Sequence, residues 1–301
     1  MPAFVTGADI RNFLDNICAA LDIEYKTETT TNIRRAWDRV KYLINQDIPV
    51  PLQADMYYLP YLMNERERRL KAIKVPKRVP AVELHFGGHA IVMVGYNEKR
   101  KEAYIYDAWL QEMQTISYED LQRARSSKFK PFPPNNCLWK FTFPETLPPL
   151  DEAVRKSFNQ TISNFYDGPS FTGIRGERKL AKEIKEWPEI FSEKELIEAL
   201  WVGMYVFGLF MSGTASGMFR EAYSRFLVEA SRILKEEKLR RIARIFSKAS
   251  DNWAAIAHIA KEAIETRDKI ALEKALKIAS DKIMETSYLE EKALDLLKET
   301  I

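Results

Sequence analysis

The chain has 301 residues, 46% of them hydrophobic and 30% charged, which is enough to bury the core of one large domain or of two ordinary ones. The net charge is only +3, and basic residues alternate with acidic ones, so nucleic acid is not expected as a partner. Two cysteines, Cys18 and Cys137, make neither a disulfide framework nor a zinc site, and we expect a reducing compartment, the cytoplasm.

No targeting or membrane-spanning segment is predicted. The stretch MPAFVTGADIRNF lacks the basic region and the apolar run that a signal peptide contains. The most apolar run, residues 199–211, has 13 residues, whereas crossing a bilayer takes about 20. We interpret this run as a helix that is buried on all sides.

The first part of the chain is predicted to mix helices and strands. Apolar residues at helical spacing predict helices near residues 8–21 and 29–46. The stretch IPVPLQADMYYLPY, residues 48–61, predicts a strand whose prolines end its regular pairing. The charged stretch of residues 64–83 is interpreted as an excursion or a lid.

A β-hairpin is predicted next. HAIVMVGYN (89–97) and EAYIYDAW (102–109) are rich in β-branched and aromatic residues, and the short polar stretch EKRK separates them. NCLWKFTF, residues 136–143, predicts a further strand. Together these elements predict an antiparallel sheet.

The character of the sequence changes at PETLPPLDEA, which predicts a domain boundary near residue 148. Beyond it, almost all periodicity is helical. The predicted helices cover residues 151–163, 173–186, 193–211, 217–236, 238–263, 266–281 and 284–300. The predicted fold class is therefore α+β, with an α+β domain over residues 1–147 and an all-helical domain over residues 148–301.

The predicted hairpin places a carboxylate beside a histidine. If Tyr96 pairs with Glu102, His89 lies opposite Trp109, and Asp107 is the diagonal neighbour of His89 on the same face. Such neighbours lie about 7–8 Å apart at Cα, within reach of a His–Asp side-chain pair. A shift of one residue would put the two side chains on opposite faces.

Asp107 interrupts an apolar strand, where a lone buried carboxylate is costly. A neighbouring imidazole offsets that cost, and the carboxylate in return orients the ring, as in Cys-His-Asp and Ser-His-Asp systems. Gly87 and Gly88 let a substrate or another segment approach His89 closely. The alternative is a structural histidine that is hydrogen-bonded in the core, with the glycines serving only the turn.

Five stretches carry a resemblance to a known family. They are IPVPLQADMYYLPY, HFGGHAIVMVGYN, YIYDAW, LQRARSSKFKPFPPNNCLWKF and SGTASGMFREAYSRFLVEAS. In these stretches the chain resembles the butirosin biosynthesis protein H family over most of residues 1–255. The resemblance implies a partial papain-like, cysteine-dependent acyltransferase domain followed by a helical domain.

The resemblance also implies a reaction. An acyl or aminoacyl group would pass from the thioester of an acyl carrier protein to a small-molecule amine, with no metal or organic cofactor. His89 would be the general base, and Asp107 would orient it. Hydrolysis of a peptide or amide is the closely related chemistry, with water as the acceptor.

Four further residues are predicted to bind substrate. Gly88 adjoins the candidate base, and Asp55 and Tyr58 lie close to it if their strand neighbours the hairpin; packing or surface roles explain them as well. Arg220 follows the small-residue turn SGTASG (212–217), where it could contact the phosphate of a carrier-protein arm. A tight turn between packed helices is the alternative.

The nucleophile is the main departure from the family. Family members carry the nucleophilic Cys before the segment that matches MPAFVTGADI, so we expect the chain to be N-terminally incomplete or to have lost its nucleophile. Cys18 falls inside a predicted helix and Cys137 enters a strand, so both are interpreted as core residues. His85 and His258 are interpreted as structural residues and not as metal ligands. A non-catalytic binding module, or a subunit whose partner supplies the Cys, remains the alternative.

Overall fold

The computed structural model describes residues 13–62, 85, 87–108, 110–130, 132–210, 217–266 and 268–301. These residues form two compact units, and each unit is described by itself. The described residues from Ile23 to Phe143 form the sheet unit. Those up to Asp22, together with those from Pro144 onward, form the helical unit.

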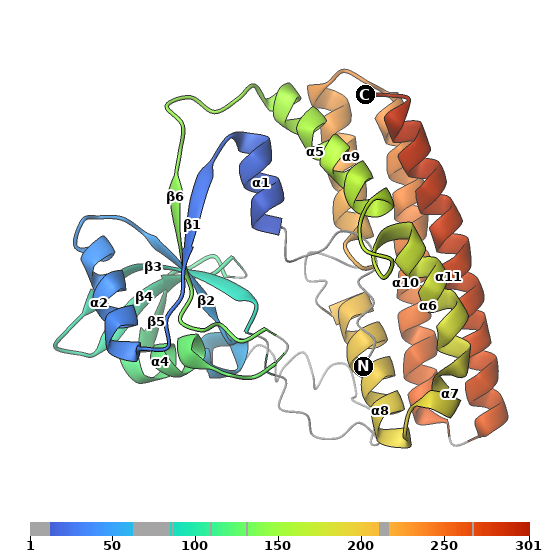
Figure 1. The fold of residues 1–301 in the computed structure, drawn as a ribbon, viewed down its shortest axis with the longest axis horizontal. Coiled ribbons are helices and arrows are strands. Elements are labelled where there is room, and N and C mark those ends of the chain that lie inside the picture. The colour runs from blue at the N-terminus through green and yellow to red at the C-terminus, as the bar shows by residue number, and fades with distance from the viewer. Residues whose placement is uncertain are drawn as a thin grey trace. The chain divides into compact units, whose positions relative to one another are not determined.

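The sheet unit is built on one antiparallel sheet with the strand order β1-β6-β2-β3-β4-β5 (Figure 1). Its elements are β1 (Glu24–Glu28), α2 (Ile33–Ile44), β2 (Val50–Ala54), the 3-10 turn η2 (Met56–Tyr58), β3 (His89–Asn97), β4 (Glu102–Tyr106), β5 (Gln114–Ser117), α4 (Tyr118–Ser126) and β6 (Leu138–Thr142). The predicted hairpin is present as β3 and β4.

The core of the sheet unit follows from the two periodicities of its sequence. Along β2, Val50, Leu52 and Ala54 are buried at every second position, as strand alternation requires. Helix α2 buries Val40 and Leu43 at helical spacing, and α4 adds further apolar residues to the same core. Both helices therefore cover the face of the sheet that carries the alternating buried residues.

Three elements of the sheet unit escape sequence prediction. Strands β1 and β5 read EYKTE and QTIS, so polar residues occupy most of their positions. Helix α4, YEDLQRARS, is capped by Ser117, whose side chain accepts a hydrogen bond from the backbone N–H of Asp120. The charged stretch of residues 64–83, interpreted as an excursion or a lid, lies entirely outside the described residues, because residues 63–84 are not described.

The helical unit confirms the predicted change of character, and with the sheet it confirms the α+β fold class. Its elements are α1 (Phe13–Leu21), α5 (Leu150–Tyr166), α6 (Gly173–Glu183), the 3-10 turn η3 (Ile184–Glu186), α7 (Trp187–Ile190), α8 (Glu193–Glu198), the π-helix η4 (Ala199–Phe210), α9 (Arg220–Ile233), α10 (Lys238–Glu265) and α11 (Lys269–Lys298). Helix α1 packs against α5 and so groups with this unit.

Helix α11 corrects one prediction. The sequence predicts two helices with a break near residues 282 and 283, but α11 runs unbroken as one of the two long helices in Figure 1. Ile283 is fully buried, and Thr286 and Glu290 continue the buried stripe at helical spacing. The stripe packs along α10, so tertiary packing carries the helix through the expected break.

The apolar run of residues 199–211 forms a π-helix up to Phe210 instead of an ordinary α-helix. Trp201 and Tyr205 are buried and stack with ring centroids 4.8 Å apart. Gly203 is exposed, so the prediction that this helix is buried on all sides is wrong at that position. Among the described residues, no helix has both the length and the apolar character needed to cross a bilayer.

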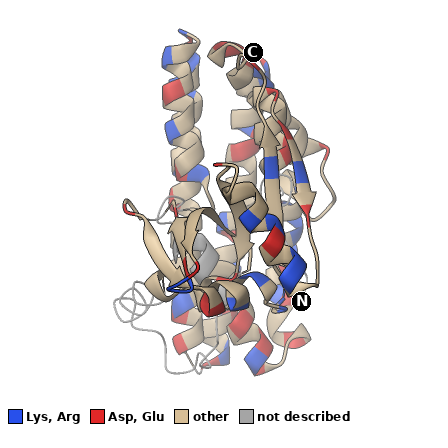
Figure 2. Cartoon of the chain, turned by 90° about the vertical axis from the view of Figure 1, so that its left-hand side faces the viewer, with Lys and Arg blue, Asp and Glu red and all other residues tan. Residues whose placement is uncertain are grey.

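Charge is spread evenly over both units. Figure 2 shows basic and acidic residues interspersed along the helices, with neither sign gathered on one element. Several opposite charges pair one helical turn apart, for example Arg123 with Glu119 on α4. Exposed pairs of this kind contribute only about 0.3–0.5 kcal/mol each, so they add little to the stability of the fold.

Candidate functional site

His89 is the first residue of β3, and strand alternation turns its side chain toward the core. His89, Ile91 and Met93 are buried, whereas Ala90 between them is exposed. Strand β2 runs antiparallel to β3 and places Ala54 opposite His89. The condition under which Asp55 and Tyr58 lie near His89, that their strand neighbours the hairpin, is therefore met.

The register of the hairpin differs from the prediction beside its turn. Asn97, and not Tyr96, pairs with Glu102. If this register continued to the end of the strands, Asp107 would lie on the opposite face from His89.

A β-bulge restores the predicted register before the site is reached. Val94 is an extra residue in β3, because its two neighbours pair with consecutive residues of β4. Beyond the bulge, Met93 pairs with Ile105, which is the predicted register. Asp107, two residues after Ile105, consequently shares a face with His89. The predicted partner Trp109 lies outside the described residues.

The two side chains meet in a short contact. Nε2 of His89 lies 2.7 Å from Oδ2 of Asp107, with side-chain exposures of 9% and 0%. The hydroxyl of Tyr61 donates to the same Oδ2 at 3.3 Å. Burial and the Asp107 carboxylate raise the pKa of Tyr61, so its hydroxyl keeps its proton and remains a donor. The predicted proximity of His89 and Asp107 is confirmed.

The contact with Asp107 determines which ring nitrogen of His89 can act as a base. An ionised carboxylate can only accept hydrogen bonds, so Nε2 carries the ring proton. Nδ1 then carries the lone pair and is the nitrogen that can take a proton from a reacting group. This arrangement matches the orienting role of a carboxylate in nucleophilic catalysis.

A second His–Asp pair lies in the same unit, and the sequence interpretation missed it. Nδ1 of His85 lies 2.7 Å from Oδ2 of Asp55, and the Ser127 hydroxyl donates to that oxygen at 2.6 Å. Oδ1 of Asp55 accepts from the backbone N–H of Tyr57, and the Asp55 N–H donates to the carbonyl of Ala124. Asp55 therefore ties the end of β2 to α4 and to the segment that precedes β3.

The imidazole of His85 is held between aromatic rings. It stacks on Phe129 with centroids 3.4 Å apart and ring planes 2° apart, and Tyr57 packs at 4.1 Å. Ser127, His85 and Asp55 have the composition of a catalytic triad but not its geometry, because the serine donates to the aspartate and not to the histidine. The cluster is a structural brace.

Asp55, Tyr58 and Gly88, which were predicted to contact substrate, have different surroundings in the structure. Asp55 is fully buried and its carboxylate is bound by protein groups, which argues against the predicted contact with an amine. Tyr58 is partly buried and packs against the core of the sheet unit. Gly88 is exposed in the turn that leads to His89, and this position is compatible with an approaching substrate.

Gly87 is glycine because another segment lies directly against its backbone. A Cβ at this position would stand 2.1 Å from the carbonyl oxygen of Phe132 and 2.6 Å from the Pro134 ring. The carbonyl of Gly87 also accepts from Nε2 of Gln53 at 2.8 Å. The turn before His89 is thus fixed from two sides.

Arg220 lies in the helical unit, and its surroundings do not fit the ligand contact that the sequence suggested. Its guanidinium is buried and makes two short bonds to Glu290 and one to Glu177. It also donates to the carbonyl of Met218. Because two carboxylates occupy the guanidinium, this geometry argues against the predicted phosphate contact. Residues 211–216, most of the small-residue turn, lie outside the described residues.

Neither cysteine has the environment of a nucleophile. Both thiols are reduced and buried. Burial, together with Asp15, raises the pKa of Cys18. Burial raises the pKa of Cys137 to about 11, although the nearby Arg125 acts in the opposite direction. A reactive cysteine needs a lowered pKa and partial exposure, so the interpretation of both residues as core residues agrees with the structure.

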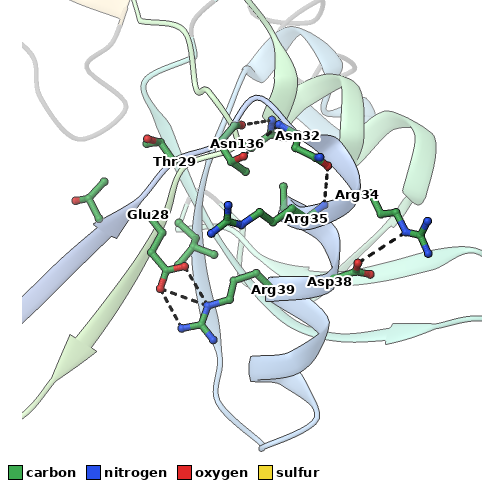
Figure 3. Close-up of a pocket in the computed structure, with 12 residues that line it drawn as sticks. Glu28, Thr29, Asn32, Arg34, Arg35, Asp38, Arg39 and Asn136 are labelled. Atoms are coloured by element: carbon green, nitrogen blue, oxygen red, sulfur yellow. Dashed lines mark hydrogen bonds and ion pairs between the residues drawn. The ribbon is translucent and has the colours of Figure 1, made fainter.

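A polar cavity of about 920 Å³ opens elsewhere in the sheet unit, between α2 and the β1–β6 strand pair. Figure 3 shows Arg39 bridging to Glu28 from one side, with Arg35 extending from the same helix. Neither His–Asp pair is among the residues that line it, which are Thr27, Glu28, Thr29, Thr30, Asn32, Arg34, Arg35, Ala36, Asp38, Arg39, Asn136 and Leu138.

Within the described part of the chain, no three His, Cys, Asp or Glu side chains are gathered so as to hold a metal ion. The two histidines of the sheet unit each contact one carboxylate instead. With Asp107 holding its ring, and Tyr61 donating to Asp107, His89 is placed to transfer a proton.

Comparison with known proteins gives two family matches. Residues 119–297 match the family described as Domain of unknown function (DUF4872). Residues 1–74 match the family described as Butirosin biosynthesis protein H, N-terminal. No curated protein matches the chain. The second match supports the resemblance noted from the sequence, over the part of the chain that includes Asp55 and Tyr61.

Proposed function

We propose that this chain, which belongs to the family described as Domain of unknown function (DUF4872), takes part in acyl or aminoacyl transfer to a small-molecule amine. The match of residues 1–74 to a family named for butirosin biosynthesis supports a place in biosynthetic chemistry. The donor in this proposal is the thioester of an acyl carrier protein.

The observation that carries the proposal is the buried contact between His89 and Asp107 at 2.7 Å. A buried carboxylate that accepts from one ring nitrogen leaves the other ring nitrogen as a base of fixed direction. Tyr61 adds a second hydrogen bond to the carboxylate, so Asp107 is held as well. Such a pair serves either side of an acyl-transfer reaction, in taking up a proton and in returning it.

In the proposed reaction, the amine nitrogen attacks the carbonyl carbon of the thioester. Nδ1 of His89 takes the proton that the amine loses as the new C–N bond forms. The C–S bond then breaks, and the departing thiolate receives that proton from His89. Amide and free thiol are the products, and no electron donor or acceptor is needed.

A Cys-dependent version of this reaction splits the transfer into two steps. A thiolate first attacks the thioester, and the amine then attacks the acyl-cysteine. Cys18 and Cys137 are buried and have raised pKa values, so neither fits that role. In this version the nucleophilic thiol comes from outside residues 1–301.

A second candidate function is a non-catalytic module that binds a carrier protein or a small amine. The buried state of both thiols favours it, because a Cys-dependent enzyme exposes its nucleophile. The two candidates differ in one respect that can be measured, namely whether the His89–Asp107 pair accelerates a reaction.

The test uses the full chain with acyl- and aminoacyl-pantetheine thioesters and an aminoglycoside as the amine. Release of the thiol and the mass of the amide product are measured for the wild type and for His89→Gln and Asp107→Asn. Loss of general base catalysis lowers the rate by about 100-fold to 10,000-fold in His89→Gln. His258→Gln is the matched control, because His258 is an exposed residue of α10.

Equal rates in the wild type and in His89→Gln would remove His89 as the base. Thiol release without amide formation would indicate hydrolysis, with water as the acceptor. Carrier-protein binding without any catalysed release would favour the binding module.

A further inference from the structure

His85, which is held by Asp55 and Phe129, lies four residues before His89, the first residue of β3. His85 and His89 are separated by a turn that contains Gly87 and Gly88. Glycine has more backbone freedom than any other residue, so such a turn does not hold a direction by itself. His89 is also the first residue of β3, where a strand is least restrained by its ladder. The direction of its ring therefore depends on what anchors the turn.

Two anchors come from one short segment of the chain. Asp55 binds Nδ1 of His85 at 2.7 Å, at the start of the turn. Gln53 donates to the carbonyl of Gly87 at 2.8 Å, in the middle of the turn. Between these two residues, Ala54 pairs with His89 in the ladder. Residues 53–55 consequently contact the turn at its beginning, middle and end.

The same region also holds the partner of the base. Tyr61, six residues after Asp55, donates to Asp107 at 3.3 Å. One stretch of chain thus restrains both the histidine and the carboxylate of the candidate catalytic pair. This stretch is itself fixed, since Asp55 also accepts from Ser127 and donates its N–H to the carbonyl of Ala124.

We propose that Asp55 is a positioning residue that acts through His85 to hold the glycine turn, and thereby keeps Nε2 of His89 on Asp107. This deepens the proposed function, because it assigns the Asp55–His85 pair to the orientation of the base. It replaces the role in amine binding that the sequence suggested for Asp55. The residue touches no reacting atom and acts only through the geometry of its neighbours.

The state of the His89 ring can be read directly in this protein. The chain has three histidines, so ring-¹⁵N-labelled histidine gives three sets of signals that single substitutions assign. Long-range ¹H–¹⁵N spectra distinguish a ring with its proton on Nε2 from a mixture of tautomers. His258, exposed on α10, serves as the internal reference.

In the wild type, His89 is expected to show one tautomer, with the proton on Nε2. Asp55→Asn keeps the size of the side chain but removes its charge, and it is expected to turn the His89 signals into those of a tautomer mixture. Asp107→Asn is the positive control for that change. The acyl-transfer rate of Asp55→Asn is expected to fall by about 100-fold, as for a misplaced reactive group.

Phe129→Leu provides a second variant in case Asp55→Asn does not fold. It removes the ring on which His85 stacks and leaves the Asp55 carboxylate in place. It is expected to loosen His85 and to shift the His89 signals in the same direction as Asp55→Asn. Far-UV circular dichroism checks that each variant is folded.

A His89 spectrum that stays unchanged in folded Asp55→Asn and Phe129→Leu, while Asp107→Asn alters it, would overturn the positioning role and leave the base assignment intact. A His89 ring that loses its single tautomer in Asp55→Asn supports the positioning role even if no thioester is turned over. The two proposals can therefore fail separately.

Discussion

The imidazole of His89 and the carboxylate of Asp107 lie on one face of the sheet because β3 contains one extra residue, the bulged Val94, between His89 and the hairpin turn. If Val94 instead paired as a regular strand residue, strand alternation would direct the two side chains to opposite faces. The bulge therefore contributes to the site through the register of the two strands.

Deletion of Val94 tests this relationship. Met93 and Gly95 then become adjacent and keep their adjacent partners Ile105 and Tyr104, so we expect a regular ladder in which His89 still shares a face with Asp107. The single His89 tautomer in ring-¹⁵N spectra should therefore survive the deletion. Val94→Ala is the matched control, because it removes the side chain but keeps the extra residue. Loss of the tautomer in the deletion variant alone would contradict this account of the register.

Gly87→Ala is expected to destabilise the protein. The new Cβ would stand 2.1 Å from the carbonyl oxygen of Phe132, which is backbone and cannot swing away. Overpacking of this kind costs about 1–3 kcal/mol in the free energy of unfolding, measured by urea denaturation. Gly203→Ala is the control, because nothing lies within 4 Å of its Cβ position. Similar losses in both variants would contradict the crowded environment of Gly87.

The stability of the helical unit is expected to fall as the pH rises. Burial and the neighbouring Glu290 raise the pKa of Glu177 well above its usual value, although Arg220 acts in the opposite direction. A raised pKa in the folded state means that the folded protein binds the proton more tightly than the unfolded chain. The resulting stabilisation is complete below a pH of about 4.3, the ordinary pKa of a glutamate, and is lost as the pH rises through the folded pKa.

Glu177→Gln isolates this contribution, because glutamine resembles the protonated acid. We expect the variant to match the wild type below a pH of about 4.3 and to become the more stable of the two at higher pH. The difference grows by up to about 1.4 kcal/mol per pH unit in the free energy of unfolding from urea titrations. Parallel curves for the two proteins would show that Glu177 has the same pKa in the folded and unfolded states, which would contradict the raised pKa.

Both thiols are expected to resist alkylation in the folded protein. Cys137 has a pKa of about 11, so only about one molecule in 10,000 carries its thiolate at pH 7. Iodoacetamide treatment followed by intact mass measurement should add no label in buffer and two labels in urea. Rapid addition of one label in buffer would identify a reactive cysteine and would revive the Cys-dependent reaction within this chain.

The predictions from sequence succeeded where the alternation of apolar residues was regular and the strand had one face buried in the core. The alternation of HAIVMVGYN and the interruption of an apolar strand by Asp107 were enough to place His89 beside a carboxylate. The pair that the sequence put at the turn, Tyr96 with Glu102, was wrong, and Val94 compensated for it. A bulge has no reliable signal in a sequence, because it depends on how two strands fit together.

Two buried polar residues, Asp55 and Arg220, were not placed correctly by sequence reasoning. Asp55 and Arg220 were expected to contact ligands, and both instead contact buried protein partners. The partners His85 and Glu290 lie 30 and 70 residues away in the chain, so local pattern does not connect them. For Asp55 a signal was present, since antiparallel pairing of its strand with HAIVMVGYN brings it near the residues before His89.

The strand order has a consequence for how the protein is made. The last strand of the sheet, β6, lies between β1 and β2, so the first strand has no partner until the chain has been synthesised as far as Thr142. Strands β2 to β5 follow one another in space as in sequence, and they can pair as they leave the ribosome. During translation, the half of the sheet that carries His89 and Asp107 can thus assemble first. Strand β1 joins the sheet only after β6 has been synthesised and can pair with it.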